Sequence, residues 1–271
     1  MLLPLNKPAH LVVEPHRITA RMPKAGRPEI AVVTPVTRPE DALGPYGGIG
    51  NAIRDTLLQW SGTAGRPLYG PRRLNVEVAD TFVHYDVLHV DARRLAPAEL
   101  EHLAAVGLAD TLGLDPSSLV MRCSVQHDGL SVVVCGMPST LVETIKQAID
   151  DAGYSLNRLE PGFAAFWNGS HARTKKDSAL LAYLRGSALM LGWLRDGKWQ
   201  ALATEHLSRN DWAVLHDSCD TFCRRICVPD HAILPILFDA DIGEIPAEAR
   251  SRWHRLSPGS AVAPDITSDF A

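Results

Sequence analysis

Residues 74–90 read LNVEVADTFVHYDVLHV and have the clearest strand pattern in the chain. Apolar side chains alternate with polar ones before and after the interruption at Ala79, Asp80 and Thr81, which is the period of a half-buried β-strand. The stretch therefore predicts two strands joined as a hairpin. The next segment, 97–112, starts with a proline and repeats leucine and alanine at helical spacing, so it predicts an amphipathic helix.

The chain before this stretch predicts a small antiparallel sheet followed by a helix. Three strand-like runs, at 10–14, 17–22 and 29–36, are separated by short connectors rich in proline and glycine. Such connectors between β-branched runs indicate an antiparallel meander. Apolar residues return at helical spacing at 51–60, where we expect a helix.

The chain after residue 112 continues the alternation of strands and helices. Asp128-Gly129 and Asp196-Gly197 each separate two apolar runs, and this dipeptide is a strong hairpin signal. Strand runs interrupted by helices exclude an all-α bundle. The predicted fold class is mixed α/β with antiparallel hairpins at the sheet edges. The expected strands are 120–126, 130–135, 156–159, 180–184, 189–194, 199–207 and 233–238, and the expected helices are 139–153, 162–167, 210–227 and one near the C-terminus.

The length of the chain suits two domains. It has 271 residues, and a polar, basic stretch at 171–177 separates the two series of elements. Because domains usually contain about 100–200 residues, we expect a first half at 1–177 and a second half at 178–258. Residues 259–271, rich in serine, alanine, proline and aspartate, are expected to form a flexible tail.

The composition excludes two classes of protein. Lysine and arginine number 27 against 31 aspartate and glutamate residues, for a net charge of −4. The chain therefore lacks the basic surface of a protein that binds nucleic acid phosphates. Charged residues make up 21% of it, which is too few for a disordered chain. We expect a globular protein that does not bind nucleic acid.

No secretory signal or membrane span is predicted. The longest apolar runs, 187–194 and 232–238, have the length of strands, whereas a membrane helix needs about 18 residues or more. The N-terminus lacks a basic region followed by a long apolar stretch. These features predict a cytoplasmic protein without membrane insertion. Short basic runs at Arg72-Arg73 and 173–176 would suit peripheral docking on an anionic membrane.

Three of the five cysteines, Cys219, Cys223 and Cys227, follow one another at helical spacing. Thiols placed along one straight helix lie about 6 Å apart per step and do not converge on one tetrahedral zinc ion. We expect free, buried thiols, because free cysteine is among the most buried residue types. A metal or redox role for the three is the alternative.

The sequence has no common catalytic or phosphate-binding signature. There is no Walker loop, nucleophile elbow, dinucleotide fingerprint or zinc-protease histidine pair. Gly47-Gly48-Ile49-Gly50 precedes the helix expected at 51–60, and the start of a helix can cradle a phosphate. Because no lysine, serine or threonine follows these glycines, a flexible loop is predicted there. We assign no catalytic residue and no metal ligand.

Two segments resemble a known family. In residues 74–88 a strand pair carries an aromatic residue, Tyr85, and a helix follows. In residues 130–154 a strand ends in a small residue and proline, and a helix closes at Ala152-Gly153; a short strand then ends at Glu160-Pro161. These segments resemble the actin-like proteins of bacterial envelope machines, namely those of type IV pilus assembly and the cytoplasmic domain of the type II secretion L component. The resemblance implies an actin-like (ribonuclease H-like) α/β fold with two domains and mixed sheets.

The sequence departs from that family in both turns that would bind phosphate. Active members of the superfamily need glycines there, so that the backbone can approach the phosphates, and an acidic residue that holds metal-bound water. The first turn here is Glu14-Pro15-His16, without glycine and with a proline that removes a donor. In the second, Tyr183 stands where the family places aspartate, and no Gly-Gly adenine loop follows.

The resemblance and these departures together imply a non-catalytic scaffold without a cofactor. Such a protein would lie in the cytoplasm, at the inner face of the inner membrane, and bind protein subunits of a pilus or secretion platform. The alternative is an ATPase or kinase of the same superfamily with atypical phosphate loops, which would use ATP and magnesium. In that case the candidates for holding the nucleotide or the ion are Glu14, Asp80, Gly186 and Asp196. The oligomeric state is not predicted.

Overall fold

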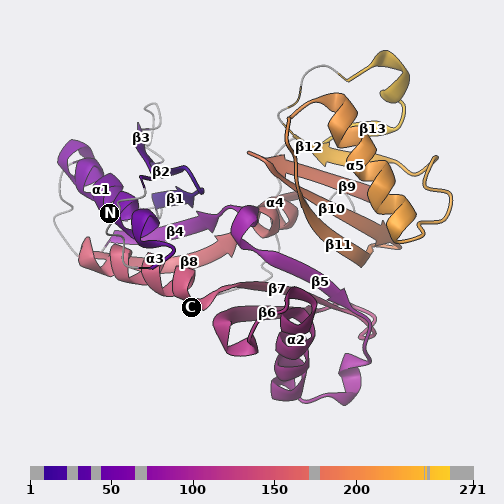
Figure 1. Ribbon diagram of the computed structural model, residues 1–271, viewed down its shortest axis with the longest axis horizontal. Helices are drawn as coiled ribbons and strands as arrows, with labels where there is room; N and C mark the ends of the chain where they lie inside the picture. The colour runs from indigo at the N-terminus through magenta and orange to yellow at the C-terminus, as the bar shows by residue number, and fades with distance from the viewer. Residues whose placement is uncertain are drawn as a thin grey trace, which may run out of the picture. The chain divides into compact units, whose positions relative to one another are not determined.

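The computed structural model describes residues 9–22, 30–37, 44–64, 72–170, 178–240, 242 and 245–256. The chain forms two compact units and passes between them more than once (Figure 1). The first unit contains the described residues up to Ala79 and Pro138–Gly162; the second contains Asp80–Met137 and the described residues from Phe163 onward. This grouping does not follow the sequential halves expected at 1–177 and 178–258. The expected linker at 171–177 and tail at 259–271 lie outside the described residues.

The first unit contains a five-stranded mixed sheet in the order β3-β2-β1-β4-β8. Strands β1 (Ala9–Val13), β2 (Arg17–Met22) and β3 (Ile30–Pro35) form the predicted antiparallel meander. Strands β4 (Arg72–Val78) and β8 (Tyr154–Pro161) continue the sheet in parallel beyond β1. Alternate residues of these strands point into one core, which explains the period of two in the sequence.

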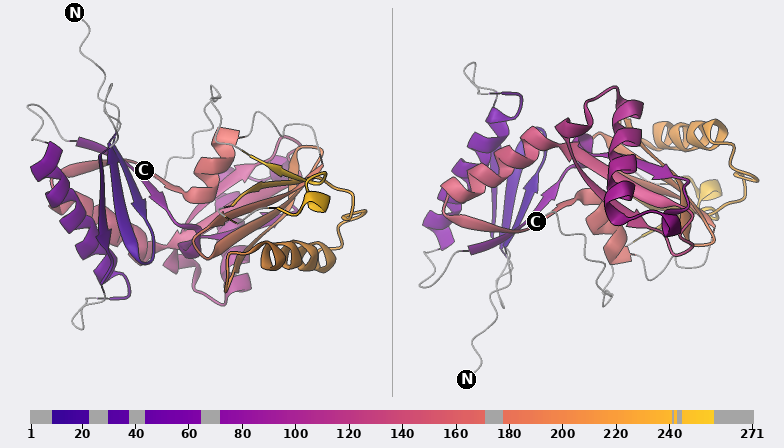
Figure 2. Two further views of the ribbon diagram at one scale, coloured as in Figure 1. Left: turned by 90° about the horizontal axis from the view of Figure 1, so that it is seen from above. Right: turned by 90° about the horizontal axis from the view of Figure 1, so that it is seen from below.

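Two helices cover one face of this sheet, α1 (Gly47–Ala64) and α3 (Ser139–Asp151) (Figure 2). The rings of Trp60 and Tyr154 stack at 5.8 Å between α1 and the start of β8. An ion pair at 2.9 Å joins Arg54 on α1 to Asp151 at the end of α3. The two helices therefore pack against each other as well as on the sheet.

The glycine-rich stretch at 47–50 is the first turn of α1, and the loop predicted there is wrong. A Cβ on Gly48 would lie 2.4 Å from the Thr37 carbonyl oxygen, and one on Gly50 would lie 2.9 Å from Cγ2 of Thr144 on α3. Helix α1 can approach its neighbours this closely only because these positions lack a side chain. Close packing accounts for these two glycines.

The hairpin predicted within residues 74–90 is also wrong. Strand β4 ends at Val78, a 3-10 turn (η1, Asp80–Phe82) follows, and β5 (His84–Leu88) belongs to a different sheet in the second unit. Asp80 is 2% exposed and accepts hydrogen bonds from the Tyr85 hydroxyl and the Phe163 N–H. The polar interruption in the sequence therefore marks a buried crossing between units and not an exposed hairpin tip.

The second unit contains a three-stranded sheet in the order β5-β7-β6. Strands β6 (Leu119–Val125) and β7 (Val132–Pro138) flank the predicted turn, in which Gly129 has a φ of +68°. Helix α2 (Pro97–Leu112) packs its buried leucines and alanines on one face of this sheet. It ends at Gly113 in the left-handed conformation, and short 3-10 turns flank it at η2 (Ala92–Arg94) and η3 (Pro116–Ser118).

A five-stranded sheet in the order β11-β10-β9-β12-β13 forms the rest of this unit. Three of its strands are the predicted meander, β9 (Ala179–Arg185), β10 (Ala188–Arg195) and β11 (Lys198–His206). The short parallel strands β12 (Ile236–Asp239) and β13 (Trp253–Arg255) complete it. After β12 the described residues hold a 3-10 turn (η5, Ala247–Ala249) and β13 in place of the expected further helix.

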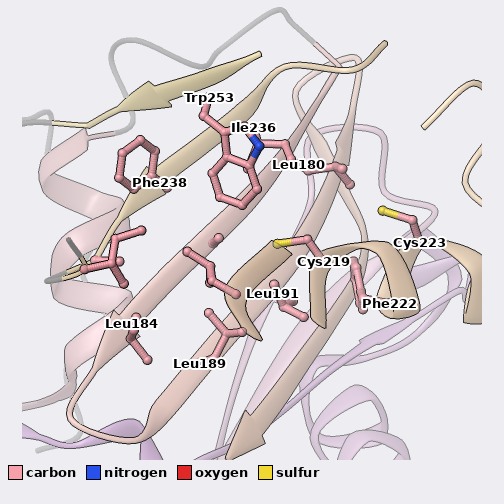
Figure 3. Packing of buried hydrophobic residues seen from close by; sticks show 14 of the residues in the cluster. Leu180, Leu184, Leu189, Leu191, Cys219, Phe222, Cys223, Ile236, Phe238 and Trp253 are labelled. Atoms are coloured by element: carbon pink, nitrogen blue, oxygen red, sulfur yellow. The ribbon is translucent and has the colours of Figure 1, made fainter. Parts of the chain in front are cut away.

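Helix α5 (Trp212–Arg225) covers one face of this sheet. Figure 3 shows Cys219, Phe222 and Cys223 of α5 among the leucines of β9 and β10. The opposite face of the sheet packs against Phe163 of α4 (Gly162–Ser170) and Val87 of β5. Because β5 shares this core with the later strands, the segment Asp80–Met137 groups with them and not with β4.

A side-chain clamp fixes the three-stranded sheet to the edge strand β11. The Gln126 amide accepts a hydrogen bond from the Trp199 N–H at 2.7 Å and donates one to the Trp199 carbonyl oxygen at 2.8 Å. The preceding residue of β11, Lys198, forms an ion pair with Asp128 at 3.1 Å. These contacts satisfy backbone groups that an edge strand would otherwise leave unpaired.

Candidate functional site

The turn between β1 and β2 is the first candidate, because the sequence places Glu14 there. The Glu14 N–H donates a hydrogen bond to the Arg17 carbonyl oxygen at 3.0 Å, which closes the turn. The Glu14 carboxylate forms an ion pair with the Arg17 guanidinium, and the hydrogen bond to Glu14 raises the pKa of Arg17. The acidic group at this position is thus held by a neighbouring cation, and Pro15 provides no N–H for a phosphate.

The turn between β9 and β10 is the second candidate. Gly186 has a φ of +57°, a conformation that favours glycine, and its carbonyl oxygen accepts a hydrogen bond from Asn210 at 2.8 Å. Arg185, which precedes it, forms an ion pair with Asp239. The guanidinium of Arg185 also lies 4.6 Å from the centre of the Tyr183 ring. The side chains of this turn are therefore engaged with one another.

Tyr183 lies in an aromatic core that we call the Phe163 cluster, made of Tyr85, Phe163, Phe166, Tyr183 and Trp199. The ring of Tyr183 is 2% exposed and stacks on Phe166 with ring centres 4.6 Å apart. A carboxylate at this position would be surrounded by apolar rings, which disfavour its charged form. The Tyr183 side chain is thus part of the packed aromatic core.

Asp80 lies beside the Phe163 cluster and forms hydrogen bonds with two of its residues. One carboxylate oxygen accepts a hydrogen bond from the Tyr85 hydroxyl at 2.7 Å, and the other accepts one from the Phe163 N–H at 2.8 Å, at the start of α4. Burial, and next the nearby Asp80 charge, raise the pKa of Tyr85 well above its usual value. Asp80 and Tyr183 are therefore brought close to the same ring, Phe163, in a structural arrangement.

Asp196 does not join this arrangement. It lies in the turn between β10 and β11 with a φ of +53°, and its side chain is 76% exposed. Gly186 lies at the other end of β10, which has 8 residues, so the two positions are about 25 Å apart at roughly 3.3 Å per residue. Gly186 and Asp196 cannot bind one small ligand together, and Glu14 belongs to the first unit.

A carboxylate pair that the sequence reasoning missed lies in the first unit, at the ends of β4 and β8. Glu77 and Glu160 are direct partners in the parallel pairing of these strands. The Glu160 side chain is 7% exposed and forms an ion pair with Arg158 at 2.7 Å. Burial raises the pKa of Glu160, Arg158 lowers it and Glu77 raises it. The available signal was a glutamate between Leu159 and Pro161 in an otherwise apolar strand end.

The three cysteines of interest do not form a site. Cys219 and Cys223 are buried in the core beneath α5, as expected (Figure 3). Cys227 is exposed after the end of the helix. Burial raises the pKa of the Cys219 thiol, and it raises that of Cys223 to about 11. Within the part of the chain that the structure describes, no three histidine, cysteine, aspartate or glutamate residues gather in a way that could hold a metal ion.

Comparison with solved structures identifies the architecture. A protein of Bacteroides thetaiotaomicron with an actin-like ATPase fold and unknown function matches with a TM-score of 0.58 and 7% identity, over 93% of this chain and 91% of that one. The chain has an actin-like ATPase fold. The resemblance drawn from the sequence is thus confirmed at the level of the fold, as is the α/β class with mixed sheets.

Two more structures with similar architecture belong to envelope machines. The PilM-PilN type IV pilus biogenesis complex matches with a TM-score of 0.59 and 14% identity, over 95% of this chain and 90% of that one. The cytoplasmic domain of EpsL, an inner membrane component of the type II secretion system of Vibrio cholerae, matches with a TM-score of 0.52 and 11% identity, over 92% and 89%. No protein-family model and no curated protein matches the sequence.

None of the helices in the described residues has the length and apolar character needed to cross a membrane.

Proposed function

We propose that this protein is a non-catalytic actin-like scaffold of a bacterial pilus or secretion platform. It acts in the cytoplasm at the inner membrane, where it binds cytoplasmic segments of partner subunits. The observation that carries the proposal is that the chain's own side chains occupy both turns where an active relative would bind phosphate. Glu14 is paired with Arg17 in one turn, and Tyr183 is packed in the Phe163 cluster beside the other.

The first turn is poorly suited to a nucleotide for electrostatic reasons. Magnesium-bound water needs a carboxylate that is free to accept hydrogen bonds from it. The Glu14 carboxylate would first have to leave Arg17, and the turn would still lack the N–H at position 15. Arg17 could contact a phosphate by itself, but one exposed cation without converging donors makes a weak anion site.

The second turn lacks the acidic group altogether. Tyr183 cannot take up the role of a carboxylate, because a tyrosine side chain carries no negative charge near neutral pH. Asp239 is the direct neighbour of Tyr183 on β12, but its carboxylate is paired with Arg185. The chemistry that nucleotide hydrolysis requires is thus replaced at both turns by internal contacts.

The similarity to envelope proteins supports the cellular role. PilM is found in a complex with PilN in type IV pilus biogenesis, and EpsL is an inner membrane component of a secretion system. A chain with their architecture and without the groups for hydrolysis suits a role in which binding surfaces matter more than turnover. The short basic runs noted above would assist docking at the membrane surface.

Nucleotide binding tests the proposal directly. We expect isothermal titration calorimetry with ATP and magnesium to give no binding at micromolar affinity, and the melting temperature to stay unchanged, because a ligand of the native state would raise it. Binding that is lost in Glu14→Gln, together with release of inorganic phosphate, would establish the enzyme instead. Arg17→Ala, which removes the partner of Glu14 and keeps the carboxylate, is the matched control.

Partner binding tests the scaffold role. If genes for pilus or secretion components lie next to this one, peptides with the cytoplasmic sequences of their membrane-anchored products should bind the purified protein in calorimetry. Binding should be the same with and without ATP. A protein that binds none of these peptides would contradict the role in a platform, and so would a gene surrounded only by metabolic genes.

An ATPase or kinase is the second candidate, and the carboxylate pair Glu77 and Glu160 is the observation in its favour. A buried carboxylate at the end of parallel strands is a common position for an acid or base. If ATP is hydrolysed, Glu160→Gln should abolish turnover while leaving the fold intact by circular dichroism. Turnover that survives this substitution would remove Glu160 from any catalytic role.

A further inference from the structure

We propose that the free edge of β3 pairs with β3 of a second copy of this chain. The two strands would run antiparallel about a two-fold axis, and the two five-stranded sheets of the first units would join into one continuous sheet. The proposal concerns self-association only and does not depend on the scaffold role or on nucleotide binding.

The backbone of β3 has donors and acceptors that point away from its own sheet. β3 is an edge strand, paired with β2 from Arg17 opposite Pro35 to Met22 opposite Ile30 without a bulge. The Val36 N–H donates a hydrogen bond to the His16 carbonyl oxygen of the β2 side at 2.9 Å. Because successive residues of a strand point to opposite sides, the outward groups belong to Ala31, Val33 and Pro35. They have no hydrogen-bond partner among the described residues.

Natural edge strands are usually protected by charged side chains, by bulges or by very short length. β3 has six residues, Ile-Ala-Val-Val-Thr-Pro, and none of them is charged. The Val33 side chain is 56% exposed, which makes it one of the exposed large apolar residues in the structure. Apart from the proline at its end, this strand shows none of these protections within the residues that the structure describes.

The position of Pro35 selects the register of self-pairing. Pro35 has no N–H, so the full set of outward donors and acceptors is found only at Ala31 and Val33. Placing Ala31 opposite Val33 of the second copy makes two mutual pairs and four inter-chain hydrogen bonds. Val32 then faces Val32 of the second copy on the two-fold axis, and each exposed Val33 is covered by an alanine.

A second copy suits this edge better than a charged foreign strand. Self-pairing brings no like charges into opposition, because β3 carries none, and it matches β-branched residues across the axis. The paired segment is small compared with the roughly 20–30 residues per side of a standard stable interface. The dimer should therefore be weak and reversible, and populated at high protein concentration.

Sedimentation velocity at concentrations from about 10 μM to 1 mM, the range of weak association, tests self-association. We expect the weight-average mass of the wild-type protein to rise toward twice the monomer mass, and Val33→Lys to stay monomeric because an edge lysine opposes pairing. Leu58→Lys changes a residue that is 63% exposed on α1, and this matched control should associate like wild type. A wild-type protein that stays monomeric, or an unchanged Val33→Lys dimer, would overturn the proposal.

Disulfide trapping tests the register without relying on Val33→Lys. In a Cys227→Ser background, Val32→Cys should give a covalent dimer under mild oxidation, since facing residues of a non-hydrogen-bonded pair lie about 4.5 Å apart between Cα atoms, within disulfide reach. Val33→Cys should not, because two positions 33 would lie offset along the strands. Mass spectrometry of the linked peptide identifies the bond. Preferential trapping of Val33→Cys, or of neither variant, rejects the pairing.

Discussion

Tyr85 donates a hydrogen bond from its buried hydroxyl to the carboxylate of Asp80, with the two oxygens 2.7 Å apart. Tyr85 is the second residue of β5 in one sheet, and Asp80 is the first residue of η1, the turn that follows β4 of another sheet. The second carboxylate oxygen of Asp80 accepts a hydrogen bond from the Phe163 N–H at the start of α4. One carboxylate therefore fixes the turn, the strand and the helix that surround the Phe163 cluster.

Tyr85→Phe should destabilise the protein by about 1–3 kcal/mol, because it leaves a buried carboxylate oxygen without its donor. The free energy of unfolding in urea, followed by tryptophan fluorescence, measures this loss. Tyr154→Phe is the matched control: it removes a bond between two neutral hydroxyls, to Ser61 at 2.8 Å, and should cost about 0.5–1.5 kcal/mol. Equal losses of stability in the two variants would show that the buried Asp80 carboxylate does not need the hydrogen bond from Tyr85.

Stability should fall at alkaline pH because of Tyr85 and the buried thiols. Burial raises the pKa of Tyr85 well above its usual value and that of Cys135 to about 12. The folded protein keeps these protons to higher pH than the unfolded chain does, so stability is complete below the unfolded pKa values, near 9 for a thiol. This contribution to stability is then lost as the pH rises through the pKa values that these groups have in the folded protein. Urea midpoints between pH 8 and 11 should decrease, and Cys135→Ala should flatten the decrease; a constant midpoint would contradict this.

The cysteines should differ sharply in reactivity. Cys227 is exposed, whereas Cys219 and Cys223 are buried beneath α5. An aromatic disulfide reagent should label Cys227 in the native protein and reach the two buried thiols only after unfolding, since their raised pKa values keep them protonated. Cys227→Ser should remove the fast phase. Fast labelling of Cys219 in the native state would mean that α5 opens readily.

Alanine substitutions at two helical glycines should have opposite effects. Gly48→Ala places a Cβ against the Thr37 carbonyl oxygen and should destabilise by about 1–3 kcal/mol through overpacking. Gly107→Ala in α2 meets nothing closer than 3.6 Å, so it should stabilise by about 0.5–1 kcal/mol through helix propensity. Thermal unfolding of both variants gives the comparison. Stabilisation by Gly48→Ala would show that α1 can move away from Thr37.

Most strands and helices could be predicted from the sequence, because the spacing of apolar residues that marks each of them lies within a short stretch of the chain. The helix at 97–112 and the turns at Asp128 and Asp196 were predicted from neighbouring residues alone. The error at 74–90 arose because alternation shows that a strand exists but not which sheet it joins. That choice depends on Asp80 reaching Phe163, a residue far away in the sequence.

The candidate site was less predictable for the same reason. The turn residues Glu14 and Tyr183 were found through a family resemblance, but their pairing with Arg17 and packing on Phe166 required coordinates. Glu160 was missed because its partner Glu77 is brought beside it only by the parallel register of β4 and β8. A single sequence does not contain a register between distant strands.

The late position of β8 has a consequence for how the chain folds during synthesis. β4 pairs with β1 on one edge and with β8 on the other. β8 is synthesised only after the whole segment Asp80–Met137. The open edge of β4 is therefore exposed on the ribosome until residue 161 has emerged, and pairing across such a distance in sequence is intrinsically slow. Chains stopped before β8 should be prone to aggregation, whereas chains that include it can close the sheet before the remaining strands are made.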